Sequence, residues 1–562
     1  MTFWPKFMVQ TSPPNTASNR IRYAGWVLVT IVSAVTLLSM LMTPLGLATD
    51  IATYTLAGAQ YDAGQTEDPN VLVSVDPQNI SLNRETTLTW WPRSYGSVPR
   101  ATKQFVGYFG IDLNEGQTMR WIVRLGWLLA ISLWTCFFWQ SASRNALPWL
   151  IAILMCARYS TANLFLFDGG EYFYWCVFPA VLLVNLAAIK NRSSNTSTIV
   201  LAMLAGFCAP CLVFCKYSAG LSAVAFGVAW MWMVYRKQIR PNQLFYWSVG
   251  AGTATAIVFW LQWLPSGNPT QIDSPMQWTP ILWGLGAWLF AMTDLGTLVN
   301  KFTVDILPAM GNHHDGSEGW LFLPFIFLVL LILRRENGKT NTVINPLGRQ
   351  LAVIHLIGFT LVLVAMLVRG SAIHMDTRFL RPAAIAMMPW IIPALASRVV
   401  DGIAKSIRIS AGVLVVLLVI MPCAYGVAAM WEKAWTLADV GPNGLRHASL
   451  DLKMDSKMFF ADLLAVSSPD DVIYVIDPAL GIPLVSRRLF TEEHASLRTK
   501  EELAQRTFNG RPQGRLLIPL PKFMIDDGRA IDICDSFKDI PHWTTSEMRG
   551  QPYWILLISS TE

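Results

Sequence analysis

The run YAGWVLVTIVSAVTLLSMLMTPLGL, residues 23–47, decides the fold class, because it has the length of a membrane span and carries no charge. A spanning helix needs about 20 mostly apolar residues. The run is too long for the apolar part of a signal peptide, and no small-residue cleavage site follows it, so we expect a retained anchor. Together with ten later apolar runs it predicts about eleven spans, at 23–47, 121–139, 147–166, 172–189, 197–214, 218–235, 244–264, 319–334, 350–368, 378–397 and 409–430.

The composition supports a polytopic membrane protein. Of the 562 residues, 53% are hydrophobic and 14% are charged, whereas soluble globular proteins have about 25% charged residues. The 24 tryptophans suit many lipid–water boundaries. The basic residues lie in short loops between the apolar runs, so the net charge of +6 does not indicate a nucleic-acid partner. Seven of the eight cysteines lie in or beside apolar runs, and no disulfide framework is implied.

Lysine and arginine set the predicted orientation. With a cytoplasmic N-terminus, the cytoplasmic loops hold sixteen basic residues and only two acids, Glu336 and Asp401, as the positive-inside rule requires. A crossing at the apolar segment 279–299 would place the charged turn RRENGK outside, so we expect this segment to lie at the outer face or to dip into it. The localisation that follows is a multi-pass protein of the plasma (inner) membrane.

The chain therefore divides into three predicted parts, mainly helical and with most loop material on the outer face. They are a cytoplasmic tail (1–22), a transmembrane domain (23–430) with outer loops 48–120 and 265–318, and a C-terminal extracytoplasmic domain (431–562). Apolar strand patterns alternate with helical patterns in the last part and predict a small α/β domain. The expected strands are 471–478, 515–521 and 553–560, with helices ending near Val466 and over 500–506.

Charged residues at the outer membrane face are candidates for function, because holding them near lipid is costly. Asp50 follows the first span and stands before a helical pattern, where it is either a helix-end acid or a group that meets a substrate from the bilayer. Asp168 and Glu171 flank a Gly-Gly turn in FDGGEYFYW (167–175). That turn is either an ordinary polar turn or the place of a second acid beside Asp50.

Two further outer segments carry candidate residues. GNHHDGSEGW (311–320) holds His313, His314 and Asp315, which suit an acceptor- or phosphate-contacting loop better than a metal site, since adjacent histidines point in different directions. RGSAIHMDTRFLRP (369–382) leads into the tenth span. Arginine forks match phosphate oxygens, so a lipid-linked phosphate would account for this basic segment, although plain snorkelling to headgroups is the alternative. Its candidate residues are Arg369, His374, Arg378 and Arg381.

These features together resemble the GT-C superfamily of membrane glycosyltransferases, in particular the group of bacterial aminoarabinose and mannosyl transferases and protein O-mannosyltransferases. The resemblance rests on Asp50 in ATDIATYTLAGAQYDAG, on YFGIDLNEGQTMRWIVRL (108–125), on Arg378-Phe379-Leu380-Arg381-Pro382, and on a small outer domain after the last helix. The chain differs in having one acid after the first span, and in having WWPRSYGSVPR (90–100) where the group commonly has a His-x-Pro element.

The resemblance implies that a sugar moves from a polyprenyl-phosphate donor to a glycan, lipid or protein acceptor, with inversion at the anomeric carbon. Asp50 would be the general base, and Asp168 or Glu171 a second acid. Arg378, and with it Arg381, would neutralise the departing phosphate. The resemblance implies no definite cofactor, and a requirement for a divalent cation is left undecided. The other partners expected are membrane lipids.

Two other functions remain as alternatives. A polymerase or ligase of the O-antigen type also joins polyprenyl-linked glycans, but it lacks the early acid and usually has its large loop late, unlike the loop 48–120. A transporter of lipid-linked sugars would carry polar residues at mid-membrane and repeated halves. The predicted spans are nearly free of charge and show no internal repeat.

Overall fold

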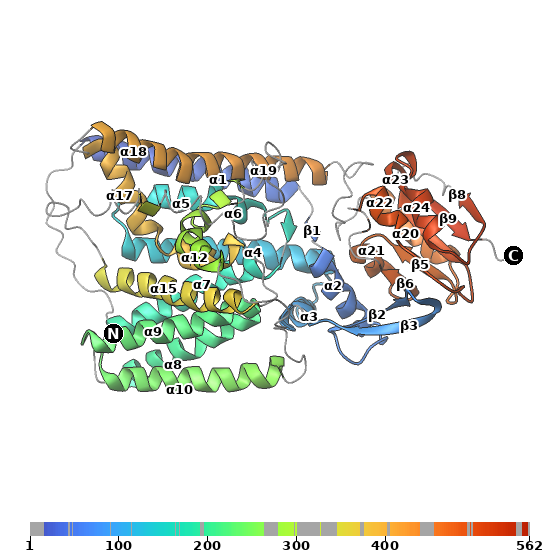
Figure 1. Ribbon diagram of the computed structural model, residues 1–562, viewed down its shortest axis with the longest axis horizontal. Helices are drawn as coiled ribbons and strands as arrows, with labels where there is room; N and C mark the ends of the chain where they lie inside the picture. Colours follow the sequence, from blue (N-terminus) through green and yellow to red (C-terminus); the bar gives the residue numbers. More distant parts are fainter. Residues whose placement is uncertain are drawn as a thin grey trace.

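In the computed structural model, the described residues are 16–42, 45–47, 49–89, 91–113, 115–162, 164–167, 169–191, 196–263, 279–296, 298–299, 326–327, 345–370, 376–401, 405–438, 454–491, 495, 498–546 and 554–559. Helices dominate, and most of them form a bundle that fills one side of Figure 1, with a separate sheet at the other end of the long axis.

Within these ranges eight helices are long and apolar enough to cross a membrane. Several continue directly into a short turn of tighter or wider helix. They are α1 (Thr16–Met42), α4 (Glu115–Ser141), α7 (Gly170–Lys190), α8 (Thr196–Cys211) with η1 (Leu212–Phe214), η2 (Tyr217–Gly220) with α9 (Leu221–Tyr235), α10 (Pro241–Val258) with η3 (Phe259–Trp263), α15 (Pro346–Val368), and α18 (Lys405–Val415) with η6 (Val416–Ile420) and α19 (Met421–Ala438).

These eight helices match eight of the eleven predicted spans. The predicted span 378–397 is a pair of helices bent by 80°, formed by η5 (Thr377–Leu380), α16 (Arg381–Ile385) and α17 (Met388–Asp401). Pro389 explains the bend, because its ring would clash with the carbonyl of Ile385 in a continuous helix.

The remaining predicted spans differ. The run 147–166 is a short helix, α5 (Leu147–Cys156), which ends because Ala157 is extended, followed by α6 (Arg158–Ala162). Nearly all of the run 319–334 lies outside the described residues. The apolar segment 279–299 forms α12 (Thr279–Ala291), packed on α15 and η5. Its 13 residues extend about 20 Å, less than the roughly 30 Å of bilayer hydrocarbon.

Close helix contacts in the bundle use small residues, as is usual where no hydrophobic driving force acts between helices in lipid. The tightest contact joins α8 and α10. A Cβ atom at Gly206 would lie 1.9 Å from the carbonyl oxygen of Trp247, and one at Gly250 would lie 2.0 Å from that of Met203. Any larger residue at either position would force the two helices apart.

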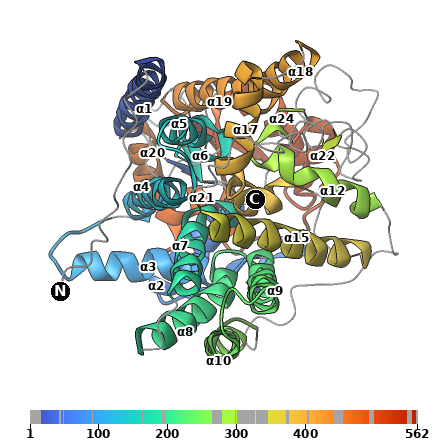
Figure 2. The same cartoon turned by 90° about the vertical axis from the view of Figure 1, so that its left-hand side faces the viewer.

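The first long loop is folded and lies between the bundle and the C-terminal sheet (Figure 1). A two-residue strand, β1 (Gly46–Leu47), leads into α2 (Thr49–Asp62). The antiparallel hairpin of β2 (Val71–Asp76) and β3 (Asn79–Thr87) follows, and then α3 (Ser94–Gly107). Figure 2, a view along the bundle, shows that α3 projects sideways beyond the spanning helices.

The C-terminal part is a five-stranded mixed sheet with helices packed on it, so the predicted small α/β domain is confirmed in its fold class. The strand order is β6-β5-β7-β9-β8, with β5 parallel to β6 and β7, and β9 antiparallel to β7 and β8. The strands are β5 (Val472–Val475), β6 (Arg488–Thr491), β7 (Leu516–Pro521), β8 (Trp543–Ser546) and β9 (Trp554–Ser559). The helices are α20 (Met454–Val466), α21 (Pro478–Gly481) with η7 (Ile482–Leu484), α22 (Lys500–Ala504), α23 (Lys522–Asp526) and α24 (Arg529–Ser536).

The hairpin and α2 hold the sheet against the bundle. The backbone N–H of Thr491 donates to Ser74 Oγ at 3.2 Å, and Ser74 Oγ donates to the Leu489 carbonyl at 3.3 Å. Arg488 donates to the Ser81 carbonyl at 2.9 Å, and α2 packs against α21. The helix that begins next to Asp50 is therefore enclosed between the two parts of the molecule.

Candidate active site

A short backbone ladder brings the end of the first span beside the predicted acidic turn. Strand β1 pairs in parallel with β4 (Leu166–Phe167), and the Gly46 N–H donates to the Phe165 carbonyl at 2.7 Å. The chain after β4 turns through Gly169 at φ 105°, and a Cβ there would lie 3.2 Å from Ile51 Cδ1. Only glycine fits this position, so the turn delivers Glu171, in the first turn of α7, next to the start of α2.

Asp50 lies in the first turn of α2, half-buried, and accepts a hydrogen bond from the indole Nε1 of Trp91 at 3.2 Å. This bond uses Oδ2, and among the described residues no donor to the other oxygen, Oδ1, is found.

Trp91 is held in place through its backbone. Its N–H donates to the hydroxyl of Tyr54 at 2.9 Å, while its carbonyl accepts from the same hydroxyl at 3.0 Å and from that of Tyr217 at 3.2 Å. Gln262 donates to the Tyr217 hydroxyl at 2.8 Å. Burial raises the pKa of Tyr54 far above its usual range, so this hydroxyl stays protonated and keeps both contacts.

A cluster of two cations and two acids adjoins the Trp91 ring. Lys216, between η1 and η2, forms a buried ion pair with Glu171. Its Nζ lies 5.2 Å from the Trp91 ring centroid and 4.2 Å from that of Phe379. Such aromatic faces stabilise a partly desolvated ammonium group.

Arg378 in η5 completes this cluster. Its Nε lies 3.3 Å from Glu171 Oε1 and 2.9 Å from Asp376 Oδ2. Among the described residues, its two terminal amino groups make no hydrogen bond, and the side chain is 38% exposed. The planar end of the guanidinium is therefore open to an oxyanion, which it can bind with two parallel hydrogen bonds.

A continuous chain of contacts thus runs from Asp50 through Trp91, Lys216 and Glu171 to Arg378. Four of these residues come from the turns at 48–50, 169–171, 215–217 and 376–380, and Trp91 comes from the loop before α3, all on the side predicted to be outside. The helices bring them to the end of the bundle that faces α2 and α3 (Figure 1).

Arg381 points to a different partner from Arg378. It is buried, donates to Asp294 Oδ1 at 2.8 Å, and lies with its guanidinium carbon 4.8 Å from the Tyr159 ring centroid. Arg158 approaches the same carboxylate at 3.9 Å. The geometry therefore gives Arg381 a role in fixing the bent helix pair to α6 and to the turn after α12, not a direct place beside Glu171.

Of the other predicted residues, the structure describes Arg369, which ends α15, is exposed and is not part of this chain of contacts. Among the described residues, no group of three or more His, Cys, Asp and Glu side chains is placed to hold a metal ion. The predicted residues outside the described ranges are Asp168, His313, His314, Asp315 and His374.

Comparison with known proteins gives a distant likeness in fold. No family model and no curated protein matches the sequence. The solved structure of ArnT from Cupriavidus metallidurans bound to undecaprenyl phosphate covers 96% of this chain and 98% of its own, with 11% identity and a TM-score of 0.48. A second solved structure is AglB, the oligosaccharyltransferase of Archaeoglobus fulgidus, in complex with an inhibitory peptide and a dolichol-phosphate. The match covers 96% of this chain and 74% of the AglB chain, with 11% identity and a TM-score of 0.45.

Likeness at this distance assigns no activity, so the function has to come from the residues of the site. Two residues of the chain of contacts between Asp50 and Arg378 were missed by sequence reasoning. Lys216 stands in the three-residue turn between two spans, on a side predicted to be poor in basic residues, and that position was the available signal. Trp91 carried no signal, since WWPRSYGSVPR was treated as a departure from the resembled group.

Proposed function

We propose that this chain is an inverting membrane glycosyltransferase that moves a sugar from a polyprenyl-phosphate donor to an acceptor hydroxyl on the extracytoplasmic face. The observation that supports this most is the continuous contact chain between Asp50 and Arg378. It links a carboxylate at the indole N–H of Trp91 to Lys216 beside the Trp91 ring and to Arg378 beyond Glu171. Displacement of a phosphate leaving group requires such a base and such positive charge.

In the proposed reaction, Asp50 Oδ1 takes the proton of the acceptor hydroxyl while the hydroxyl oxygen bonds to the anomeric carbon. The bond from that carbon to the phosphate oxygen breaks, and its electron pair leaves with the polyprenyl phosphate. Arg378 and Lys216 stabilise the added negative charge. Glu171 holds both cations in place through its single carboxylate, and Trp91 orients Asp50.

The orientation of the enzyme in the membrane, its acceptor surface and two further contact residues are inferred from the sequence. The charge bias of the loops puts the N-terminus in the cytoplasm and the C-terminal sheet outside. The large outer segments, the α2–α3 region and the sheet, offer the surface for a glycan, lipid or protein acceptor. Arg369 and His374 precede η5, so they are proposed contacts of the donor or acceptor at its margin.

The test is the variant Asp50→Asn, purified and inserted in lipid nanodiscs. Transfer from a panel of undecaprenyl-phosphate-linked sugars should fall about 10³-fold, as when a general base is lost. Binding of undecaprenyl phosphate, measured by native mass spectrometry, should be unchanged because the cations remain. Glu85→Gln, which alters an exposed acid of the same loop, is the control and should keep full transfer.

Full transfer by Asp50→Asn would remove this residue from the mechanism. Binding of the lipid-linked sugar by the unaltered chain without any transfer, across the whole acceptor panel, would instead favour the transporter alternative.

A further inference from the structure

Asp376 is the one acid of the described Arg378 cluster to which the proposed reaction gives no role. It immediately precedes η5, and its Oδ1 accepts a hydrogen bond from the backbone N–H of Arg378 at 2.8 Å. Its Oδ2 lies 2.9 Å from Arg378 Nε. The same carboxylate therefore contacts both the backbone and the side chain of the arginine, although capping η5 needs only the backbone contact.

The two acids beside Arg378 differ in their exposure. The Glu171 side chain is 10% exposed and forms the buried ion pair with Lys216, whereas the Asp376 side chain is 40% exposed. Arg378 is exposed to a similar degree as Asp376, so these two side chains lie together at the accessible side of the cluster. An oxyanion that binds the outer amino groups of Arg378 is then separated from the Asp376 carboxylate by a single guanidinium group.

The charges of this cluster cancel among the described residues. Lys216 and Arg378 are positive, and Glu171 and Asp376 are negative. The proposed donor is a phosphate diester, which carries one negative charge. The polyprenyl phosphate that leaves is a monoester, and it carries close to two negative charges at neutral pH because its second pKa is about 6. A nearby carboxylate therefore repels the product more strongly than the donor, since the repulsion grows with the charge of the ligand.

We propose that Asp376 is a specificity-determining residue that weakens binding of the departing polyprenyl phosphate relative to the donor, and thereby promotes release of the product. The inference rests on the proposed function, but it concerns the affinity of the phosphate site and not the transfer step. Positive charge at Arg378 stabilises the leaving group while the bond breaks. The same positive charge would retain the product after the reaction, and Asp376 opposes this retention.

The variant Asp376→Asn tests the proposal in the full chain in nanodiscs. Asparagine keeps an oxygen that can accept from the Arg378 N–H, and it removes the charge. Native mass spectrometry measures the dissociation constants of two probes, undecaprenyl phosphate and its methyl diester, neither of which carries a sugar to transfer. Binding of the diester should tighten about threefold and that of the monoester about tenfold, because each unit of phosphate charge loses the same repulsion in a largely aqueous site.

Asp76→Asn is the matched control. Asp76 Oδ1 accepts from the backbone N–H of Gln78 at 3.0 Å, which is the same local contact two residues along the chain, but Asp76 ends β2 in the outer hairpin. Its affinity for both probes should equal that of the parent chain. Asp376→Ser keeps a capping oxygen without the charge, so it should show the same tighter binding even if the asparagine variant is unstable.

Unchanged or weaker binding of undecaprenyl phosphate to both Asp376 variants would overturn the proposal and leave this residue as a helix cap. Equal tightening for the two probes would overturn the discrimination between product and donor. Failure of the parent chain to bind either probe would contradict both this inference and the proposed function. The expected shifts in a chain that transfers no sugar would support the role of Asp376 and contradict the proposed function alone.

Discussion

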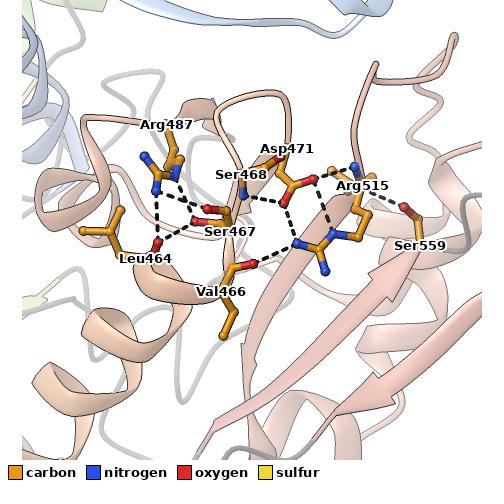
Figure 3. A network of polar contacts seen from close by, with 9 residues as sticks. Leu464, Val466, Ser467, Ser468, Asp471, Arg487, Arg515 and Ser559 are labelled. Carbon is orange, nitrogen blue, oxygen red and sulfur yellow. Dashed lines mark hydrogen bonds and ion pairs between the residues drawn. The ribbon is translucent and has the colours of Figure 1, made fainter.

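Two clusters of arginine and carboxylate in the described part of the chain are built in opposite ways. In the C-terminal sheet, Asp471 accepts from the backbone N–H groups of Ser468 and Arg515 at 2.8 and 2.7 Å and from the Arg515 guanidinium at 2.7 Å (Figure 3). The same arginine donates to the Val466 carbonyl at 2.8 Å. At the end of the bundle, Arg378 approaches its acids with Nε, which lies 3.3 Å from Glu171 and 2.9 Å from Asp376.

The difference shows which cluster can bind a ligand. The network around Asp471 is closed by the backbone, with Arg487 donating to Ser467 Oγ and to the Leu464 carbonyl beside it, so it joins the end of α20 to β5 and β7. The cluster around Glu171 is made of side chains, lies beside the rings of Trp91 and Phe379, and leaves the Arg378 side chain 38% exposed. We infer that the first cluster stabilises the fold and the second is the one available for chemistry.

Replacing an arginine in each cluster should separate these roles most strongly. Arg378→Ala should lower transfer by about 10²–10³-fold, as loss of one group that stabilises developing charge does, and should weaken undecaprenyl phosphate binding without lowering the melting temperature. Arg515→Ala should do the reverse. Activity assays and thermal unfolding of both variants in the same detergent measure this, and equal loss of stability in the two would contradict the assignment.

The next largest effect is expected for Asp471→Asn. The Asp471 side chain is 2% exposed, whereas its partner Arg515 is 35% exposed. The loss is therefore that of charge-assisted hydrogen bonds, about 2 kcal/mol. Denaturant unfolding of the full chain, monitored by the proteolytic susceptibility of the C-terminal part, should show this loss. Asp470→Asn changes the exposed neighbouring carboxylate and should leave the unfolding midpoint within error of the parent chain.

The same aspartate predicts how the stability depends on pH. Burial alone would raise the pKa of Asp471, but the hydrogen bonds from Arg515 and Ser468 outweigh it and hold the pKa below its usual value. The folded state thus binds fewer protons, so its contribution is complete above the unfolded pKa of about 4 and is lost as pH falls through the folded pKa. Thermal unfolding between pH 6 and pH 3 should show a fall that is smaller in Asp471→Asn.

Sequence reasoning found the parts of the site that charge reveals. Asp50, Glu171 and Arg378 were recognised because an ionised group at the end of an apolar run is costly, and the fold brings all three together. It could not distinguish the role of Arg378 from that of Arg381. Their partners differ because of the bend at Pro389 and because Asp294, from a distant segment of the chain, binds Arg381. It also could not predict that the apolar run 147–166 is not one continuous helix, because the extended backbone at Ala157 ends α5.

The smallest predicted effect concerns the residue that joins the two halves of the site. Trp91→Phe keeps a ring beside Lys216 but removes the Nε1 donor to Asp50, which makes one hydrogen bond of 3.2 Å. A single hydrogen bond contributes about 1 kcal/mol, so kcat should fall about fivefold while KM for the donor stays constant, because the cations are untouched. Trp91→Ala also removes the ring from Lys216, and its KM should rise as well. If Trp91→Phe raised KM and spared kcat, the indole would act on the donor and not on the base, and the separation of the site into two functional sides would be wrong.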